Sequence, residues 1–261
     1  MPLPLGPALR LAVGTLTVLP TGAVTVDRAT ARGAMLLAPL AVVPLALAAA
    51  LVTGVAAALD LPATAVGLLG VAVLALGTRA LHLDGLADTV DGLGTGWDRA
   101  RALDVMRRGD VGPMGVVALV LVLGLQAVAA GALVDGWADA LGLAVLVCAS
   151  RAALVVVCRA GVPAARPSGL GAAVAGTVPT ALAAAVWVVV AALLALTWVL
   201  RGGAPLGGLL TAALALAAAA LLVTWCRRRL GGVTGDVMGA VVEVTLTVLL
   251  LGATATGGWT A

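Results

Sequence analysis

Three aspartates, Asp84, Asp88 and Asp91, lie four and three residues apart in the sequence. On a helix of about 3.6 residues per turn, these positions share one face. Three carboxylates stacked on one face repel one another, and a divalent cation relieves that repulsion. A solvated acidic face is the alternative interpretation, but the position directly after an apolar segment makes uncompensated charge costly. The spacing therefore predicts catalytic carboxylates that bind a hard cation such as Mg²⁺, which prefers oxygen ligands.

A second acidic constellation lies in the stretch GGVTGDVMGAVVE, residues 231–243. Asp236 stands at the start of the last apolar segment, and Glu243, the only glutamate, follows seven residues later on the same helical face. Glu243 then lies about 10 Å deeper at about 1.5 Å per residue, where an ionised group is costly and normally functional. We give equal weight to a substrate-binding role for Glu243 and to a polar contact that locks helices together.

His82, the only histidine, precedes the aspartate series by two residues. A hydrogen bond at the membrane interface is one interpretation of His82, and proton transfer during catalysis is the other. Glycines accompany both acidic stretches, and their bare backbone predicts the close approach of a phosphate group. These glycines are Gly85, Gly92, Gly231, Gly232, Gly235 and Gly239.

Arginines near these acids are candidates for contact with phosphate oxygens. Arg107 and Arg108 precede Asp110, which lies at the Gly-Pro entry to an apolar segment. Arg151 stands inside an apolar segment, so it needs either a carboxylate partner or an anionic ligand. Arg166 lies in the polar stretch RAGVPAARPSGLG. The residues that we predict to bind substrate are Arg107, Arg108, Asp110, Arg151, Arg166 and Glu243.

The composition requires an environment that is largely lipid. The chain of 261 residues is 62% hydrophobic and 10% charged, with a mean hydropathy of +1.19, whereas soluble domains carry about 25% charged residues. This excludes a typical cytosolic enzyme, a disordered chain and a nucleic-acid module. All 15 basic residues are arginine, and in a membrane protein the net charge of +3 marks cytoplasmic loops rather than a nucleic-acid partner.

Seven apolar stretches are long enough to cross a bilayer as helices, and they lack the alternation of barrel strands. They cover residues 33–59, 62–80, 113–134, 138–158, 178–200, 205–225 and 237–257. The predicted fold is therefore an all-α polytopic membrane bundle that forms a single catalytic domain, residues 1–261. Residues 1–31 are expected to form an amphipathic or re-entrant N-terminal segment.

Charge predicts the orientation of these spans. With the N-terminus inside, thirteen of the fifteen arginines fall on the inner side, and only Arg201 falls outside. The Asp-rich segment 81–112 is then cytoplasmic. We expect a multi-pass protein of the cell membrane whose active site faces the cytoplasm.

Four stretches together resemble cobalamin synthase, the adenosylcobinamide-GDP ribazoletransferase family. They are RALHLDGLADTVDGLG (79–94), MRRGDVGPMG (106–115), ARPSGLG (165–171) and GGVTGDVMGA (231–240). Their order and spacing extend over nearly the whole chain. HLDGLADTVDG followed much later by GGVTGD is the most specific part of the resemblance.

The resemblance implies an integral membrane, Mg²⁺-dependent enzyme of late vitamin B12 assembly. Its substrates would be adenosylcobinamide-GDP and α-ribazole or the 5′-phosphate of α-ribazole. Its products would be adenosylcobalamin, or the corresponding phosphate, and GMP. By motif, Asp84, Asp88 and Asp91 would be metal ligands, and Asp236 would complete the site. Membrane lipid is an expected partner, and assembly into a homo-oligomer is left open.

Two other functions compete with this interpretation. A CDP-alcohol phosphotransferase also uses clustered aspartates and Mg²⁺, but its DGxxAR core is incomplete here because Asp88 follows Ala87. A transporter with a coupling site of intramembrane acids is the second alternative. It is disfavoured because no repeat is visible and the acids gather in one loop rather than at the midplane.

Overall fold

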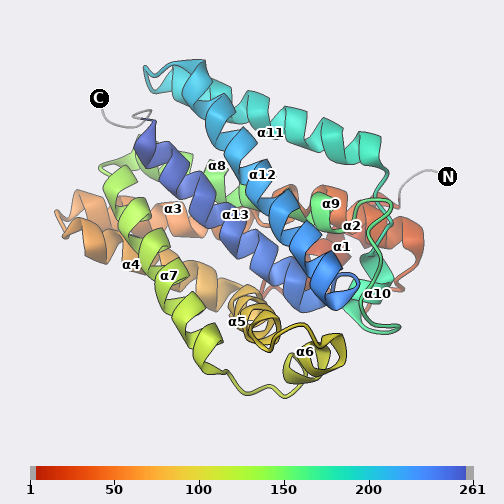
Figure 1. Ribbon diagram of the computed structural model, residues 1–261. Helices are drawn as coiled ribbons and strands as arrows, with labels where there is room; N and C mark the ends of the chain where they lie inside the picture. The colour runs from red at the N-terminus through yellow and green to blue at the C-terminus, as the bar shows by residue number, and fades with distance from the viewer. Residues whose placement is uncertain (1–3, 257–261) are drawn as a thin grey trace.

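The computed structural model describes residues 4–256, and every regular element in that range is a helix (Figure 1). The chain order is α1 (Leu5–Leu16), α2 (Arg28–Ala41), α3 (Val43–Ala58), α4 (Ala63–Gly77), α5 (Leu81–Gly94), α6 (Arg99–Val105), α7 (Pro113–Leu133), α8 (Trp137–Ser150), α9 (Ala153–Val157), α10 (Leu170–Val174), α11 (Thr180–Leu200), α12 (Pro205–Leu230) and α13 (Gly235–Ala255). Two isolated parallel bridges, Arg159 with Val178 and Ala164 with Val233, tie the polar stretch before α10 to its surroundings.

The helices are those of a multi-pass membrane protein. Within residues 4–256, six helical segments are long and apolar enough to cross a bilayer, and α2 with α3 counts as one of them. A seventh arises if α4 and α5 are counted as one bent span. This confirms the predicted helical membrane bundle of about seven spans; residue 257 of the last predicted segment lies outside the described range.

The predicted span 62–80 differs from the others. Its helix, α4, has only 15 residues, whereas a crossing needs about 20. Arg79 and Ala80 adopt left-handed backbone conformations, each with φ of 54°, and α5 departs at 91° to α4. α4 packs against α3 and α7, so we treat it as a short crossing segment. We treat α5, which turns away from α4, as lying outside the membrane-spanning segments.

The most enclosed spans are α13 and the α8–α9 segment, in which 78% and 83% of the apolar window is buried. Figure 1 shows α13 in the middle of the bundle, with α12 on one side and α7 on the other. α5 packs against the first turns of α13 and also contacts α7. The acids of α5 are thereby held beside the beginning of α13.

Glycine makes the contact between α5 and α13 possible. A Cβ atom at Gly85 would lie 2.6 Å from the carbonyl oxygen of Asp236, and one at Gly239 would lie 2.9 Å from Cα of His82. These glycines therefore admit a neighbouring helix backbone, as in other membrane bundles. Helix backbone occupies the space that a Cβ atom would fill at Gly85 and Gly239, and the approach of a phosphate group to the glycines stays a prediction.

The N-terminal segment packs along α2. The buried residues of α1 are Ala8, Ala12 and Leu16, which lie four residues apart and form one helical face. This is the pattern expected of an amphipathic helix. Residues 1–3 of the predicted segment 1–31 lie outside the described residues.

The close approach of α5 and α13 leads to a stability prediction. We expect Gly85→Ala to lower the free energy of unfolding by about 1–3 kcal/mol, because the added methyl group meets a backbone oxygen that cannot rotate away. The measurement is the thermal unfolding midpoint of the purified protein in detergent. Gly124→Ala on α7 is the matched control, since a Cβ there meets nothing within 4 Å. Equal effects of the two substitutions would contradict the predicted contact.

Candidate active site

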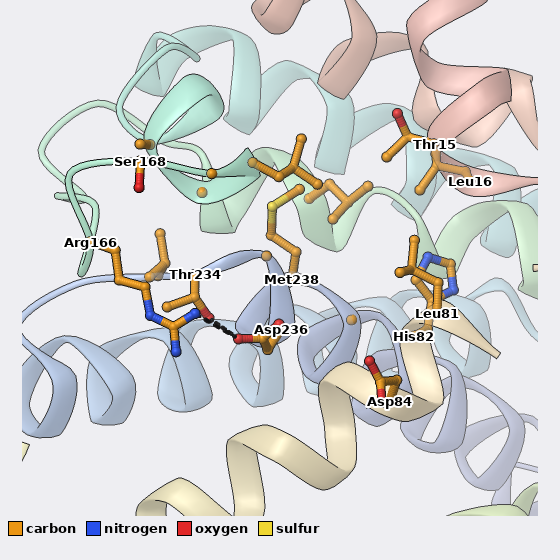
Figure 2. Close-up of a pocket in the computed structure, with 18 residues that line it drawn as sticks. Thr15, Leu16, Leu81, His82, Asp84, Arg166, Ser168, Thr234, Asp236 and Met238 are labelled. Atoms are coloured by element: carbon orange, nitrogen blue, oxygen red, sulfur yellow. Dashed lines mark hydrogen bonds and ion pairs between the residues drawn. The ribbon is translucent and has the colours of Figure 1, made fainter. Parts of the chain in front are cut away.

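The acids of α5 and α13 border one cavity of about 250 Å³. Asp84 and Asp236 both line it, together with residues of α1 and of the stretch 166–172. Figure 2 shows these two aspartates on adjacent helices, with Arg166 and Thr234 toward one side and His82 toward the other. Two motifs that are about 150 residues apart in sequence therefore meet at one place.

Asp88 lies one turn beyond Asp84 and is largely buried. Burial, followed by the charges of Asp84, Asp236 and Asp91, raises the pKa of its carboxyl to about 6, against an opposing effect of Arg166. Asp88 is therefore close enough to the other three carboxylates for their charges to destabilise its own. A cation would remove this repulsion.

The chemistry of this donor set suits a hard cation, but its present geometry is not that of a closed metal site. In residues 4–256, no group of three His, Cys, Asp or Glu side chains stands in an arrangement able to hold an ion. The repulsion felt by Asp88 acts over longer distances than a metal–ligand bond. Binding of an ion would therefore require the side chains of Asp84, Asp88 and Asp236 to turn toward one another.

Asp91 has a structural partner that its sequence position did not reveal. Its two carboxylate oxygens accept hydrogen bonds from the backbone N–H groups of Gly112, at 2.7 Å, and Gly115, at 2.8 Å. These N–H groups belong to the beginning of α7, where backbone donors have no partner within the helix. Asp91 thus fastens α7 to α5, and its role as a metal ligand stays a prediction.

Asp236 is oriented by two neighbours. The hydroxyl of Thr234 donates to Oδ2 of Asp236 at 3.1 Å, and Nη1 of Arg166 lies 3.6 Å from the same oxygen. Arg166 also donates from Nη2 to the carbonyl oxygen of Leu103 at 2.9 Å. Arg166 therefore reaches the cavity while it is anchored to α6. Its predicted contact with substrate stays a prediction.

His82 is buried, with 4% of its surface exposed, and lines the same cavity. Its Nδ1 atom lies 3.8 Å from Oε1 of Glu243, but burial, followed by the charge of Arg151, lowers the pKa of the imidazole to about 3. We therefore treat His82 as neutral rather than as an ion-pair partner. Neither ring nitrogen has a hydrogen-bond partner among the described residues.

Glu243 takes part in a buried polar contact between spans. Nε2 of Gln126 donates to Oε2 of Glu243 at 2.8 Å and lies 3.2 Å from Oγ1 of Thr247. Gln126 is the only glutamine in the chain, and it stands within an apolar segment. A single glutamine within an apolar segment indicates a hydrogen-bond partner on another helix. Glu243 does not line the cavity, so the structure supports its helix-locking role.

Arg151 lies at the break between α8 and α9 and is 1% exposed. Its Nη1 donates to Oγ of Ser150 at 2.7 Å and to the carbonyl oxygen of Val147 at 3.3 Å. No carboxylate of residues 4–256 forms an ion pair with it, and it does not border the cavity. The charge of Glu243 nevertheless acts on Arg151, so the predicted carboxylate partner lies near it without a direct ion pair. Contact of Arg151 with an anionic ligand stays a prediction.

The residues before α7 lie away from the cavity. Arg107, Arg108 and Asp110 are exposed, and none of them borders it. Arg108 instead pairs with Asp104 one turn earlier, with 2.7 Å between Nη2 and Oδ2. The sequence placed these charges near the acids, but the short helix α6 directs them to the surface.

Several cavity residues were not anticipated as such. They are Thr15 and Leu16 of α1, Ser168 and Gly169 before α10, and Thr234 before α13. Ser168 and Thr234 belong to the motifs PSG and VTGD, which offered a signal. Leu16 begins the stretch LTVLP (16–20), which loosely fits an N-terminal motif of the family that the sequence resembles. The residue types and spacing within α1 did not indicate that its last turn would border the cavity.

Comparison with known proteins places the chain in a family. The model of the family described as cobalamin-5-phosphate synthase matches residues 8–254. A protein of a Nocardioides species named adenosylcobinamide-GDP ribazoletransferase is 51% identical over 245 residues, which cover 94% of this chain and 96% of that protein. One of the same name from Bradyrhizobium diazoefficiens is 41% identical and covers 95% of this chain and 93% of its own length.

No solved structure matches the chain. The family match nevertheless includes both helices that carry the cavity acids, α5 and α13, and nearly all of the described residues. The chain belongs to the cobalamin-5-phosphate synthase family.

Proposed function

We propose that this chain is an adenosylcobinamide-GDP ribazoletransferase. It transfers the phosphocobinamide part of adenosylcobinamide-GDP to α-ribazole or its 5′-phosphate, and it releases GMP. The names of the relatives that match along nearly their full length support this reaction. They do not support the two alternatives, a CDP-alcohol phosphotransferase and a transporter. The meeting of Asp84 and Asp236 at one cavity is the observation on which the proposal for the site depends.

We infer that Asp84, Asp88 and Asp236 would hold Mg²⁺, because Asp84 and Asp236 line the cavity and the charges of both act on the carboxylate of Asp88. When bound, the ion would neutralise negative charge on the diphosphate. The donor chemistry and the raised pKa of Asp88 support this assignment. Asp91 is a further candidate ligand if its remaining lone pairs are used.

The protein groups around the cavity suit a displacement at phosphorus. The ribazole hydroxyl attacks the β-phosphorus, a new P–O bond forms, and the bond to the GMP oxygen breaks. Arg166 reaches the cavity and is a donor for phosphate oxygens. Positioning and charge neutralisation are the main contributions that such a reaction asks of the protein.

His82 is proposed to contact substrate. A neutral imidazole offers one N–H donor and one acceptor, and both nitrogens of His82 lack protein partners at the cavity. With a pKa of about 3, His82 is a weak base. We therefore assign it a hydrogen bond to the ribazole hydroxyl rather than removal of the proton, which a cavity carboxylate would accept.

The cavity suits one part of the substrate. Its volume of about 250 Å³ is at the lower limit of small-molecule sites, which are commonly about 300–1,000 Å³. We propose that the diphosphate and its immediate surroundings enter the cavity, while the bulky corrinoid remains outside its mouth.

Arginine placement supports a cytoplasmic site. The exposed residues Arg107 and Arg108 beside α6, and Arg227 and Arg228 at the end of α12, are at the end of the bundle that holds α5. Arginine-rich ends of spans usually face the cytoplasm. We propose that the protein lies in the cell membrane with this end inside.

The acidic site leads to a prediction about activity. We expect Asp84→Asn or Asp88→Asn to abolish Mg²⁺-dependent turnover, because each removes one of the charges proposed to hold the ion. The assay is GMP release from adenosylcobinamide-GDP by the purified protein, with and without Mg²⁺. Membrane insertion and the unfolding midpoint should remain near those of the unmodified chain.

Asp104→Asn is the matched control, because Asp104 is exposed on α6 and pairs with its neighbour Arg108. Its activity should be unchanged. Full activity of Asp84→Asn would refute the assignment of the site. If the unmodified protein were active without any divalent ion, the proposal that these aspartates hold Mg²⁺ for the reaction would be refuted.

The unpartnered imidazole leads to a second prediction. We expect His82→Ala to lower kcat/KM for GMP release about tenfold or more, the effect of losing one hydrogen bond to a reacting group. His82→Asn keeps a donor and an acceptor near the position of Nδ1, so it should recover part of the loss. If both variants unfold normally and retain full activity, His82 does not contact substrate.

A further inference from the structure

A second cavity shares no lining residue with the cavity that the acids border. It has a volume of about 790 Å³, and its walls are almost entirely apolar. One wall is formed by α2 and α3, the other by α11, and α8 forms the base between them. In a membrane protein, such a groove faces the acyl chains of the bilayer.

A basic cavity borders the start of the same helices. It has a volume of about 420 Å³ and is lined by Asp27, Arg28, Ala29, Arg32 and Thr177. Nε of Arg32 is buried and has no hydrogen-bond partner in the described part of the chain. Nη2 of Arg28 donates to the carbonyl oxygen of Gly176 at 3.1 Å, which holds its guanidinium at this place.

Asp27 does not neutralise this pair of arginines completely. Its Oδ1 accepts a hydrogen bond from the backbone N–H of Thr30 at 2.7 Å, so its carboxylate caps the beginning of α2. Two guanidinium groups and one carboxylate leave a net positive charge in the basic cavity. Such a cavity suits an anion.

The basic cavity and the apolar groove are joined along α2. Arg28, Arg32, Leu36 and Leu40 follow one another at intervals of four residues, so they form one continuous face of the helix. The first two line the basic cavity and the last two line the groove. The stripe therefore changes from cationic to apolar within about one turn, between Arg32 and Leu36.

The wall formed by α11 has the same order of residues, with the basic cavity at its beginning and apolar side chains along its length. Thr177 lines the basic cavity just before α11 begins, and Leu182, Val189 and Leu196 line the groove at intervals of seven residues. From Leu182 to Leu200 the wall extends about 27 Å at about 1.5 Å per residue. An extended hydrocarbon chain can lie along a groove of this length.

We propose that this combined site binds one anionic phospholipid. Its phosphate is held by Arg28 and Arg32, and an acyl chain lies in the groove between α3 and α11. The positive charge of the basic cavity matches the phosphate of such a lipid, and the apolar walls of the groove match its acyl chain. A free phosphate makes no use of the groove, and a neutral lipid makes no use of the arginines.

The test measures lipid binding by the full chain in detergent. Native mass spectrometry compares phosphatidylglycerol, phosphatidylcholine with the same acyl chains, and glycerophosphoglycerol, which lacks acyl chains. Two arginine contacts near a membrane surface are worth about a 30-fold preference. We expect one phosphatidylglycerol per chain with about that preference over phosphatidylcholine, and little binding of glycerophosphoglycerol.

Two pairs of variants distinguish the contribution of the basic cavity to lipid binding from that of the groove. Arg28→Gln with Arg32→Gln should abolish the preference for phosphatidylglycerol, whereas Arg227→Gln with Arg228→Gln removes the same charge from the exposed end of α12 and should not. Ala185→Trp fills the groove and should prevent retention of the lipid. Ala184→Trp adds the same bulk at an exposed neighbour that does not line the groove, and should leave retention unchanged.

Each remaining outcome overturns the proposal. If the Arg28/Arg32 and Arg227/Arg228 double variants lose the preference for phosphatidylglycerol equally, binding reflects surface charge alone. Glycerophosphoglycerol that binds as tightly as the lipid means that no acyl chain uses the groove. If Ala185→Trp changes the oligomeric state and leaves lipid retention intact, the groove is an interface with a second copy of the chain.

Discussion

The backbone contact between α5 and α13 determines where the chemistry of this protein can occur. α5 lies against the first turn of α13 only because Gly85 and Gly239 have no side chains at the point of closest approach. This contact brings Asp84 next to Asp236. In a bilayer, where lipid tails compete equally well for apolar surface, close packing of small residues is a main source of helix association. The same glycines that hold the bundle together therefore assemble the site.

Two polar contacts fix the remaining position of α5 and its neighbours. Asp91 supplies both its oxygens to the N-terminal N–H groups of α7, which otherwise have no partner within that helix. Gln126 of α7 reaches Glu243 of α13. Buried polar pairs of this kind add modest stability, but they allow few alternative arrangements of the helices because an unpaired partner is costly. α7 is therefore tied to both acid-bearing helices.

The two faces of the molecule that bind ligands in our proposals are built differently. The acidic cavity is bordered by segments that are distant in the sequence, so it forms only where those segments meet. The proposed lipid site lies along the outside of α2 and α11, where a simple change from arginine to leucine along one helical stripe is enough. Neither site shares residues with the other, so each can be altered separately.

The sequence alone determined the environment of the chain, the number of apolar spans and the common face of Asp84, Asp88 and Asp91, because these depend on local composition and helical spacing. It also indicated the family, through motifs that have a fixed order. Only the tertiary structure decided that Asp91 holds α7, that Arg107, Arg108 and Asp110 point away from the cavity, and that Gly85 and Gly239 face helix backbones. These facts depend on which helices meet and at what angle. The 91° bend between α4 and α5 occurs at Arg79 and Ala80, and neither residue is a glycine, so the residue types did not predict the left-handed backbone there. The partner of a polar side chain in a bundle is set by packing between distant segments, which residue spacing within one helix does not specify.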